Sequence, residues 1–505
     1  MAQPVAEAKL IPEFTLRAVL LGCLLAIVMG AANVYLGLYA GMTVSASIPA
    51  AVISMGILRG LFRRGTILEN NMVQTIASSG ESLAAGVIFT VPAFVIAGVW
   101  THFDYWTTTL IAMIGGMLGV IMMIPMRRVL IVDSAELKYP EGVACAEVLK
   151  AGEAGSTGAL RVLIGVVLGG GLKFLSSAVG FFRGTVEHAF SLSGVPVFLG
   201  GDISVALLGV GAIVGLEIAV LVFLGGALGW FLGIPILGYD PAASAASGDV
   251  LERMWGLWSK QIRYVGVGAM LVGGLWSIIK VRHGIAKGLQ ELFGSFTAGG
   301  KAKVPRTEQN LSGFQLLVTF LLIAVPLLFF TIHTVGSYGM GTFAWGLVLA
   351  NAFLFVAVAS YICGLVGSSN SPVSGMTICA LLLTAGLFSL LGLTGTVAIL
   401  ITLTISGLVC CAACTAGDIS QDLKTGYLVG ATPRLQQIGE YFGAIVPAFF
   451  MAPILTLLHH AYGIGTDTPQ ALKAPQAKLF ASLTSAIFGE GTLPWKMIGI
   501  GVGLA

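Results

Sequence analysis

The segment GTVAILITLTISGLVCCAACTA (395–416) is followed directly by the polar segment GDISQDLKTGYLVGATPR (417–434). The first segment has no charged residue, and a helix of about 20 apolar residues is long enough to cross the hydrocarbon core of a bilayer. The second segment contains two aspartates, and polar groups at membrane depth are tolerated only where protein or a cavity surrounds them. The pair therefore predicts a transmembrane helix that adjoins a polar region inside a membrane protein.

The composition extends this prediction to the whole chain. The protein has 505 residues, of which 56% are hydrophobic and 10% are charged. An average soluble protein has about 25% charged residues, and disordered chains are poor in hydrophobic ones, so both classes are excluded. The long, continuous apolar runs also exclude a transmembrane β-barrel, whose strands are short and alternating.

We therefore predict an all-α fold, a polytopic transmembrane helix bundle of about 13–14 spans. The predicted spans are 16–38, 43–60, 84–102, 107–126, 159–182, 203–216, 218–237, 263–281, 314–332, 343–366, 372–391, 395–416 and 437–458, with another beginning at Pro494. The run 203–237 is too long for one helix and is predicted to form a helical hairpin. Glycines such as Gly115, Gly119 and Gly225 are typical of helices that approach each other closely.

Basic residues indicate the orientation of these spans. Arg127 and Arg128 follow the fourth span, and the longest basic loop, 283–310, follows the eighth. Because Lys and Arg are enriched in cytoplasmic loops, we predict a multi-pass protein of the cell inner (plasma) membrane with a cytoplasmic N-terminus. The same loop divides the single transmembrane domain, 1–505, into two possible halves, 1–282 and 311–505.

Three segments, 67–83, 134–150 and 417–434, fit neither a span nor an ordinary loop, because they mix polar and apolar residues. Interrupted helices in a membrane protein often mark a transport site. We predict broken or re-entrant segments near 67–83 and 417–434 that line a cavity. The alternative is that each segment forms an amphipathic helix at the membrane surface.

Ionisable residues at membrane depth carry a large free-energy cost, and they usually mark a transport pathway or an ion pair. We predict that protons are carried by Glu81 and Asp418, with contributions from Asp422 and Lys424. Asp418 and Asp422 are four residues apart and share one face of a helix. The alternatives are that Glu81 only interacts favourably with a helix N-terminus and that the two aspartates lie in a solvated turn.

Uncharged polar residues in apolar surroundings are candidates for substrate binding. They are Asn33, Tyr35, Asn70, Asn71, Gln74, Ser368, Asn370 and Ser371. Such side chains can hydrogen-bond a peptide, and they can equally hold helices together.

The sequence carries none of the motifs of the common enzyme classes. It has no G-x-x-x-x-G-K-[ST] loop, no H-E-x-x-H and no G-x-S-x-G, so we predict that it is not an enzyme and uses no cofactor. Cys411 and Cys414 have C-x-x-C spacing, but buried thiols usually pack as small apolar groups, so we predict no metal site. No tract is basic enough for a nucleic-acid partner.

Five long segments resemble the oligopeptide transporter (OPT) family, in its prokaryotic branch related to the yellow stripe-like transporters of plants. They are NVYLGLYAGMTVSASIPAAVIS (33–54), ILENNMVQTIASSGESLAAGVIFTVPA (67–93), LKYPEGVACAEVLKAGE (137–153), GLVGSSNSPVSGMTI (364–378) and GDISQDLKTGYLVGATPRLQQ (417–437). The Asn-Pro-Gly and Lys-Ile-Pro-Pro-Arg signatures of the fungal and plant peptide branch are absent.

The resemblance implies a secondary active transporter, a proton-coupled symporter that moves oligopeptides across the bilayer by alternating access. Its alternative cargo is a metal chelate, such as a siderophore-like or metal–amino-acid complex. A channel is less favoured, because the sequence has no repeated filter loop. The resemblance also implies a homodimer. Since the apolar run 497–505 is too short to cross a bilayer, we expect the chain to be C-terminally truncated relative to the family.

Overall fold

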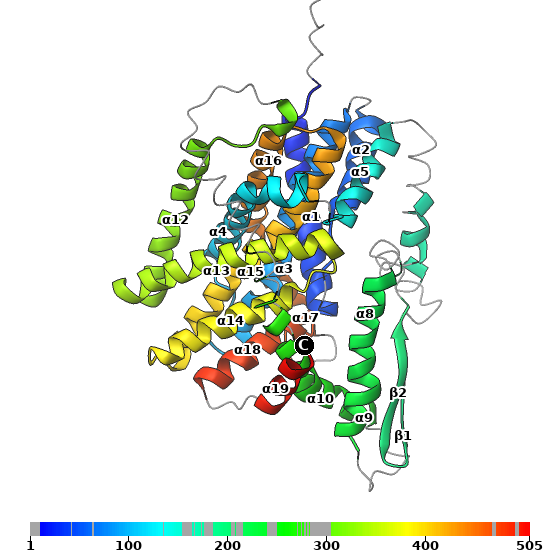
Figure 1. The fold of residues 1–505 in the computed structure, drawn as a ribbon, viewed down its shortest axis with the longest axis vertical. Coiled ribbons are helices and arrows are strands. Elements are labelled where there is room, and N and C mark those ends of the chain that lie inside the picture. Colours follow the sequence, from blue (N-terminus) through cyan, green and yellow to red (C-terminus); the bar gives the residue numbers. More distant parts are fainter. Residues whose placement is uncertain are drawn as a thin grey trace, which may run out of the picture.

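The computed structural model describes residues 11–41, 43–62, 65–134, 136–153, 164–165, 167–172, 174–175, 185–203, 208, 216–239, 250–269, 271–273, 275–276, 279, 282, 305–466, 471–489 and 494–505. Nine helices in this part of the chain are long and apolar enough to cross a membrane (Figure 1). The predicted all-α, polytopic bundle is therefore confirmed.

The elements follow one another in three groups. The first group contains α1 (Leu16–Ala40), α2 (Ser47–Met55), η1 (Gly56–Leu61), α3 (Ile67–Ile96), α4 (Tyr105–Met123), η2 (Ile124–Met126), η3 (Arg128–Val132) and α5 (Pro140–Glu153). The second group contains β1 (Thr185–Leu192), β2 (Val195–Asp202), α8 (Leu216–Ala227), η5 (Leu228–Gly233), α9 (Ile234–Leu237), α10 (Val250–Leu257) and η6 (Trp258–Ile262). The third group contains η7 (Arg306–Glu308), α12 (Gly313–Val335), α13 (Tyr338–Val366), α14 (Val373–Leu390), α15 (Gly395–Val429), α16 (Pro433–Ile445), α17 (Ala448–Tyr462), α18 (Pro475–Phe488) and α19 (Trp495–Leu504).

Helices α3 and α15 form the centre of the bundle. In the most apolar stretch of each helix, 89% of the residues are buried, whereas only 33% are buried in the corresponding stretch of α1 or α12. Helices α1, α4, α13 and α16 pack around this pair, as Figure 1 shows. The core therefore contains helices that precede residues 283–304 in the sequence and helices that follow them. Residues 283–304 lie outside the described part of the chain.

Several chain segments meet at the end of the bundle where α1 begins, which we call the α1 end. Thr66, just before α3, donates a hydrogen bond to the carbonyl of Pro12 at 2.7 Å. Arg306 pairs with Glu13 and donates to the carbonyl of Gly430, just after α15, at 2.8 Å. Helix α3 thus begins at the α1 end and α15 finishes there, so the two central helices are antiparallel.

Small residues allow the central helices to pack closely. A Cβ atom placed on Gly115 would lie 2.6 Å from the Cβ of Cys411, and one on Gly119 would lie 2.5 Å from the carbonyl oxygen of Ala412. The close approach predicted for these two glycines of α4 is confirmed. Gly225 in α8 differs, because a Cβ there meets nothing within 4 Å.

The predicted interruption near 67–83 is wrong, because α3 is continuous from Ile67 to Ile96. The polar segment 417–434 is likewise helical as far as Val429, and α16 begins at Pro433. The physical reason is that the polar side chains bond to each other across helices. Ser82 of α3 donates to Thr415 of α15 at 3.0 Å, for example, so the backbone of each helix keeps its own hydrogen bonds.

The other predicted spans agree with the observed helices to different extents. The span 43–60 is divided between α2 and η1, and the span 84–102 is the second half of a longer helix that begins at Ile67. Spans 159–182 and 203–216, and with them the first arm of the hairpin predicted at 203–237, lie largely outside the described residues. The span 263–281 lies partly outside them.

The predicted spans 159–182 and 203–216 leave a loop between them, but the segment 185–202 forms an antiparallel β-hairpin in which Leu192 pairs with Val195. Its two turn residues, Ser193 and Gly194, have φ angles of 52° and 84°, which suit the tight turns that hairpins prefer. Figure 1 shows the hairpin beside α8 and α9, at the side of the bundle. The Ser-Gly pair is the sequence signal that this expectation missed.

The packing of α4 gives a first prediction. Gly115→Ala should destabilise the protein by about 1–3 kcal/mol, because the added methyl group overlaps Cys411 and the carbonyl of Leu408. The matched change Gly225→Ala should be neutral or stabilising by up to about 1 kcal/mol, since alanine is the better helix former. Thermal unfolding of the detergent-solubilised protein measures both. Equal melting temperatures for the two variants would contradict close packing at Gly115.

Candidate functional site

Three non-helical segments meet inside the bundle. They are 43–46 before α2, 136–139 before α5, and 367–372 between α13 and α14. The amide of Ser45 donates to the hydroxyl oxygen of Ser369 at 3.1 Å, and the amide of Tyr139 donates to the carbonyl of Gly364 at 2.8 Å. The N-termini of α2, α5 and α14 therefore come together at this point.

Two carboxylates bind the backbone of these interruptions. Glu81, halfway along α3, accepts a hydrogen bond from the amide of Ala46 at 3.1 Å, just before α2. Glu141, in the first turn of α5, accepts the amides of Ser368 and Ser369, both at 3.1 Å, and the Ser368 hydroxyl at 2.5 Å. These amides have no partner within a helix, so a carboxylate satisfies them well.

Gly367 is required at the interruption before α14. Its φ angle is 87°, which favours glycine, and a Cβ atom would lie only 2.8 Å from Oε1 of Glu141. Glycine at this position therefore allows the chain to turn tightly around the Glu141 carboxylate.

Two further carboxylates project from α15 into the same region. Asp422 accepts hydrogen bonds from the side-chain amide of Gln74 and, at 3.2 Å, from the hydroxyl of Ser47. Its other oxygen, Oδ2, and Oδ1 of Asp418 are buried without a hydrogen-bond partner among the described residues. Asp418 and Asp422 are 8% and 0% exposed, so neither is a solvated turn residue.

Glu81, Glu141, Asp418 and Asp422 together form what we call the carboxylate cluster, because Glu81 interacts electrostatically with the other three. None of the four makes an ion pair in the part of the chain that the structure describes. Nearby Tyr139 and Cys145 do not add charge, since burial raises the pKa of both side chains. Several buried carboxylates so close together need protons or a cation to neutralise them in part.

Two of the predicted substrate-binding residues lie at the cluster. Gln74 contacts Asp422, and Ser368 contacts Glu141. Asn33 is close by, but its amide group holds the backbone of Val44 through two hydrogen bonds, at 2.9 and 3.2 Å.

The other predicted substrate-binding residues are more distant or make local contacts. Asn70 bonds to Thr66 and Ser54, and Asn370 donates to the carbonyl of Val366. The amide of Ser371 donates to the carbonyl of Ser368 at 3.1 Å. Tyr35 stacks on Tyr39 and is 40% exposed. Asn71 is fully buried, and neither polar atom of its side chain has a partner among the described residues.

Lys424 makes no ion pair with the cluster among the described residues. Its ammonium group donates to the carbonyl of Ile131 at 3.1 Å and lies 5.7 Å from the ring centre of Tyr139. The structure therefore brings Glu81, Asp418 and Asp422 together but places Lys424 elsewhere. Sequence reasoning also missed Ser47 and Gln421, which bind the cluster and the start of α5, because single polar residues in these helices gave no distinctive pattern.

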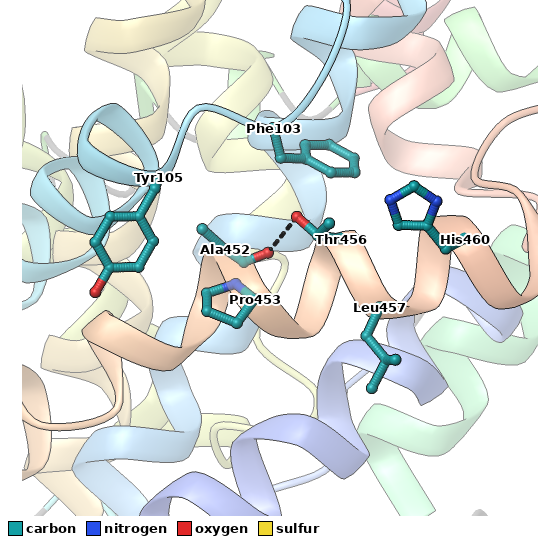
Figure 2. A pocket seen from close by; sticks show the side chains of 7 residues that line it. All are labelled: Phe103, Tyr105, Ala452, Pro453, Thr456, Leu457 and His460. Atoms are coloured by element: carbon teal, nitrogen blue, oxygen red, sulfur yellow. Dashed lines mark hydrogen bonds between the residues drawn. The ribbon is translucent and has the colours of Figure 1, made fainter.

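A separate pocket of about 490 Å³ shares no lining residue with the carboxylate cluster (Figure 2). Phe103 and Tyr105, at the start of α4, face residues of α17 across it, and the hydroxyl of Thr456 there donates to the carbonyl of Ala452 at 2.9 Å. His460 is its one ionisable lining residue besides the phenol of Tyr105. The pocket therefore lacks the groups that would recognise a charged ligand.

The role of Glu141 gives a second prediction. Glu141→Ala should destabilise the protein by about 2–3 kcal/mol, because two backbone amides at the interruption before α14 lose a charged acceptor. Glu147→Ala, in the same helix, should cost about 0–1 kcal/mol, since Glu147 only forms an exposed pair with Lys150. Melting temperatures in detergent compare the two variants. A Glu141→Ala variant as stable as Glu147→Ala would contradict the proposed support of this segment.

Comparison with known proteins confirms the predicted resemblance. The family model described as OPT oligopeptide transporter protein matches residues 13–505. A Haemophilus influenzae protein named as a candidate oligopeptide transporter is 37% identical over 501 residues, which cover 93% of this chain and 78% of the relative. The metal-nicotianamine transporter YSL3 of Arabidopsis thaliana is 22% identical over 526 residues, which cover 94% of this chain and 76% of the relative. The chain therefore belongs to the OPT oligopeptide transporter family, and it is a membrane transporter rather than an enzyme.

Proposed function

We propose that the protein is a proton-coupled symporter that moves oligopeptides by alternating access, and that substrate and protons bind at the carboxylate cluster. The observation that carries this proposal is the burial of four carboxylates, from three helices, where three helix N-termini meet. Burial without an ion pair favours states in which protons neutralise part of the charge. Protons that bind and leave reversibly provide that neutralisation.

The arrangement suits a zwitterionic peptide. One oxygen each of Asp418 and Asp422 has no partner among the described residues, and the ammonium group of the peptide provides a positively charged one. Its carboxylate fits the N-terminus of α14, which has no side-chain cap and carries the partial positive charge of a helix N-terminus. The side chains of Gln74 and Ser368 provide hydrogen-bonding groups between these two ends.

Access to the cluster requires a movement, because each of its carboxylates is at most 8% exposed. The hydrogen bond between Ser45 and Ser369 joins the two interruptions that begin α2 and α14. We propose that the cluster opens when the α13–α14 pair moves away from the α1–α2 pair, while the tightly packed helices α3, α4 and α15 stay together. One bundle thus rocks against another.

The basic residues support an orientation with the α1 end in the cytoplasm. Arg17, Arg127, Arg306 and Arg434 all lie at or near this end, where they bond to neighbouring segments. By the positive-inside rule, we propose that the N-terminus is cytoplasmic, in a multi-pass protein of the cell inner (plasma) membrane.

The second candidate cargo is a metal chelate. The similarity to a metal-nicotianamine transporter over 94% of the chain favours it, as does the absence of the Asn-Pro-Gly and Lys-Ile-Pro-Pro-Arg signatures. A cluster of buried carboxylates also attracts a positively charged complex.

Uptake into proteoliposomes distinguishes the two cargoes. Labelled short peptides and a labelled iron chelate are offered separately under an inward proton gradient, with an ionophore as the control. Peptide uptake that disappears with the ionophore supports the proposal, and chelate uptake alone supports the second candidate. Uptake of either cargo that is unaffected by the ionophore would contradict proton coupling.

The place of Glu81 gives a third prediction. Glu81→Gln should abolish gradient-driven accumulation and remove its pH dependence. Glutamine can still accept the amide of Ala46, so the start of α2 is kept, but it cannot carry a proton. Glu217→Gln, at an exposed position of α8, is the matched control and should leave uptake unchanged. Accumulation and a pH profile in Glu81→Gln that match the wild type would show that Glu81 is not the coupling group.

A further inference from the structure

Glu440 of α16 is a buried carboxylate outside the cluster, and it has no evident structural role. It is 0% exposed, and neither oxygen accepts a hydrogen bond from any described residue. Glu69 is equally buried but differs, because Arg17, Thr15 and the amide of Thr66 all bond to it. Since buried polar groups are nearly always hydrogen-bonded, an unpartnered carboxylate needs another explanation.

The charged groups that interact with Glu440 belong to α15 and to the segment after α4. Helix α16 packs against α3, α15, α4, α1 and α17. From α15, Asp422 of the carboxylate cluster interacts with Glu440 electrostatically, and from the segment after α4, Arg127 does so. The hydroxyl of Tyr441, the next residue on the same helix, also interacts electrostatically with Glu440. In the described parts of α1 and α3, Arg17 and Glu69 pair with each other at 2.6 Å, and the histidines of α17 lie at its far end.

Residues of α16 close to Glu440 in sequence contact both the carboxylate cluster and the α1 end. Gln436, one turn before Glu440, donates to the carbonyl of Asp422 at 3.0 Å and to the hydroxyl of Thr75 at 3.1 Å. Gln437 donates to the side-chain oxygen of Asn310 at 3.0 Å, and Arg127 donates to the same oxygen at 3.3 Å. Glu440 thus lies between a buried acidic site and a buried guanidinium near the end of the bundle.

Arg127 is as enclosed as Glu440. It is 1% exposed, and its Nε atom has no partner among the described residues. Burial lowers the pKa of Arg127 from its ordinary value, while the charges of Glu308 and then Glu440 oppose this. Arg127 nevertheless makes no ion pair with Glu440 in this conformation. Opposite charges that are buried but not in contact are unfavourable, so the arrangement suits a glutamate whose charge changes during the cycle.

We propose that Glu440 is a second proton-carrying site, through which protons pass between the carboxylate cluster and the α1 end, and that Arg127 stabilises the ionised form of Glu440. The inference rests on the proton coupling proposed above. In the transfer, the O–H bond of a carboxylic acid in the cluster breaks and an O–H bond forms at Glu440. When the transport cycle opens Glu440 to water at the α1 end, Glu440 gives the proton to that water, and Arg127 balances the negative charge that remains.

The test separates coupling from substrate handling. Two assays use the full chain in proteoliposomes with a labelled dipeptide, or with the labelled iron chelate if only that is taken up. One measures accumulation driven by an inward proton gradient, and the other measures counterflow exchange without a gradient. Glu440→Gln should lose accumulation but keep counterflow, because it binds substrate normally and cannot carry a proton. Glu308→Gln, the other carboxylate near Arg127, is the control and should keep both.

Two results would overturn the inference. The first is accumulation in Glu440→Gln equal to that of the wild type. The second is a folded Glu440→Gln protein that loses counterflow and accumulation equally, which indicates a structural role. If Glu440→Gln does not fold, Glu440→Asp decides, since it keeps a carboxylate in a different position relative to Arg127. It should accumulate substrate with a shifted pH profile, and an unchanged profile would contradict the proposal.

Failure of this inference is distinguishable from failure of the proposed function. If the wild-type protein accumulates substrate without a proton gradient, proton coupling itself is wrong. If the wild type needs the gradient and Glu440→Gln needs it equally, only the role of Glu440 is wrong.

Discussion

The cost of burying carboxylates among apolar helices is the constraint on which the centre of this protein depends. An unpaired buried charge costs several kcal/mol, and no cation contacts the carboxylate cluster in the described part of the chain. Glu81 and Glu141 offset part of this cost by accepting backbone amides at the starts of α2 and α14. Those amides would be unsatisfied without a carboxylate, so the interruptions and the acidic residues stabilise each other.

The central helices and the non-helical segments at the cluster are stabilised in different ways. Helices α3 and α15 are continuous and mostly buried, and glycines bring α4 against α15. The segments 43–46 and 367–372 are held instead by a few polar contacts, among them the bond between Ser45 and Ser369. A change of charge at Glu81 or Glu141 weakens those contacts directly. In the proposed mechanism, protonation is thereby linked to the opening of the site, as coupled transport requires.

The sequence was sufficient to predict the fold class, the family and three of the four carboxylates that meet in the cluster, because long apolar runs and acidic residues within them leave few alternatives. It misplaced the interruptions. Polarity at 67–83 suggested a broken helix, but Gln74 bonds to Asp422 instead of to backbone, so α3 stays intact. The real interruptions carry weaker signals, such as Ser371-Pro372 and Tyr139-Pro140, where proline disfavours a helix in the preceding residue. Glu440 was overlooked inside an apolar run, since its isolation from hydrogen-bonding partners is visible only after folding.

The most direct measurement of the central claim is proton movement itself. Proteoliposomes that contain a pH-sensitive dye and start without a proton gradient are given substrate on the outside. The account predicts that the interior acidifies as substrate enters, and that Asp418→Asn abolishes this acidification. Substrate entry without any change of internal pH would contradict the claim that the carboxylate cluster carries protons together with the substrate.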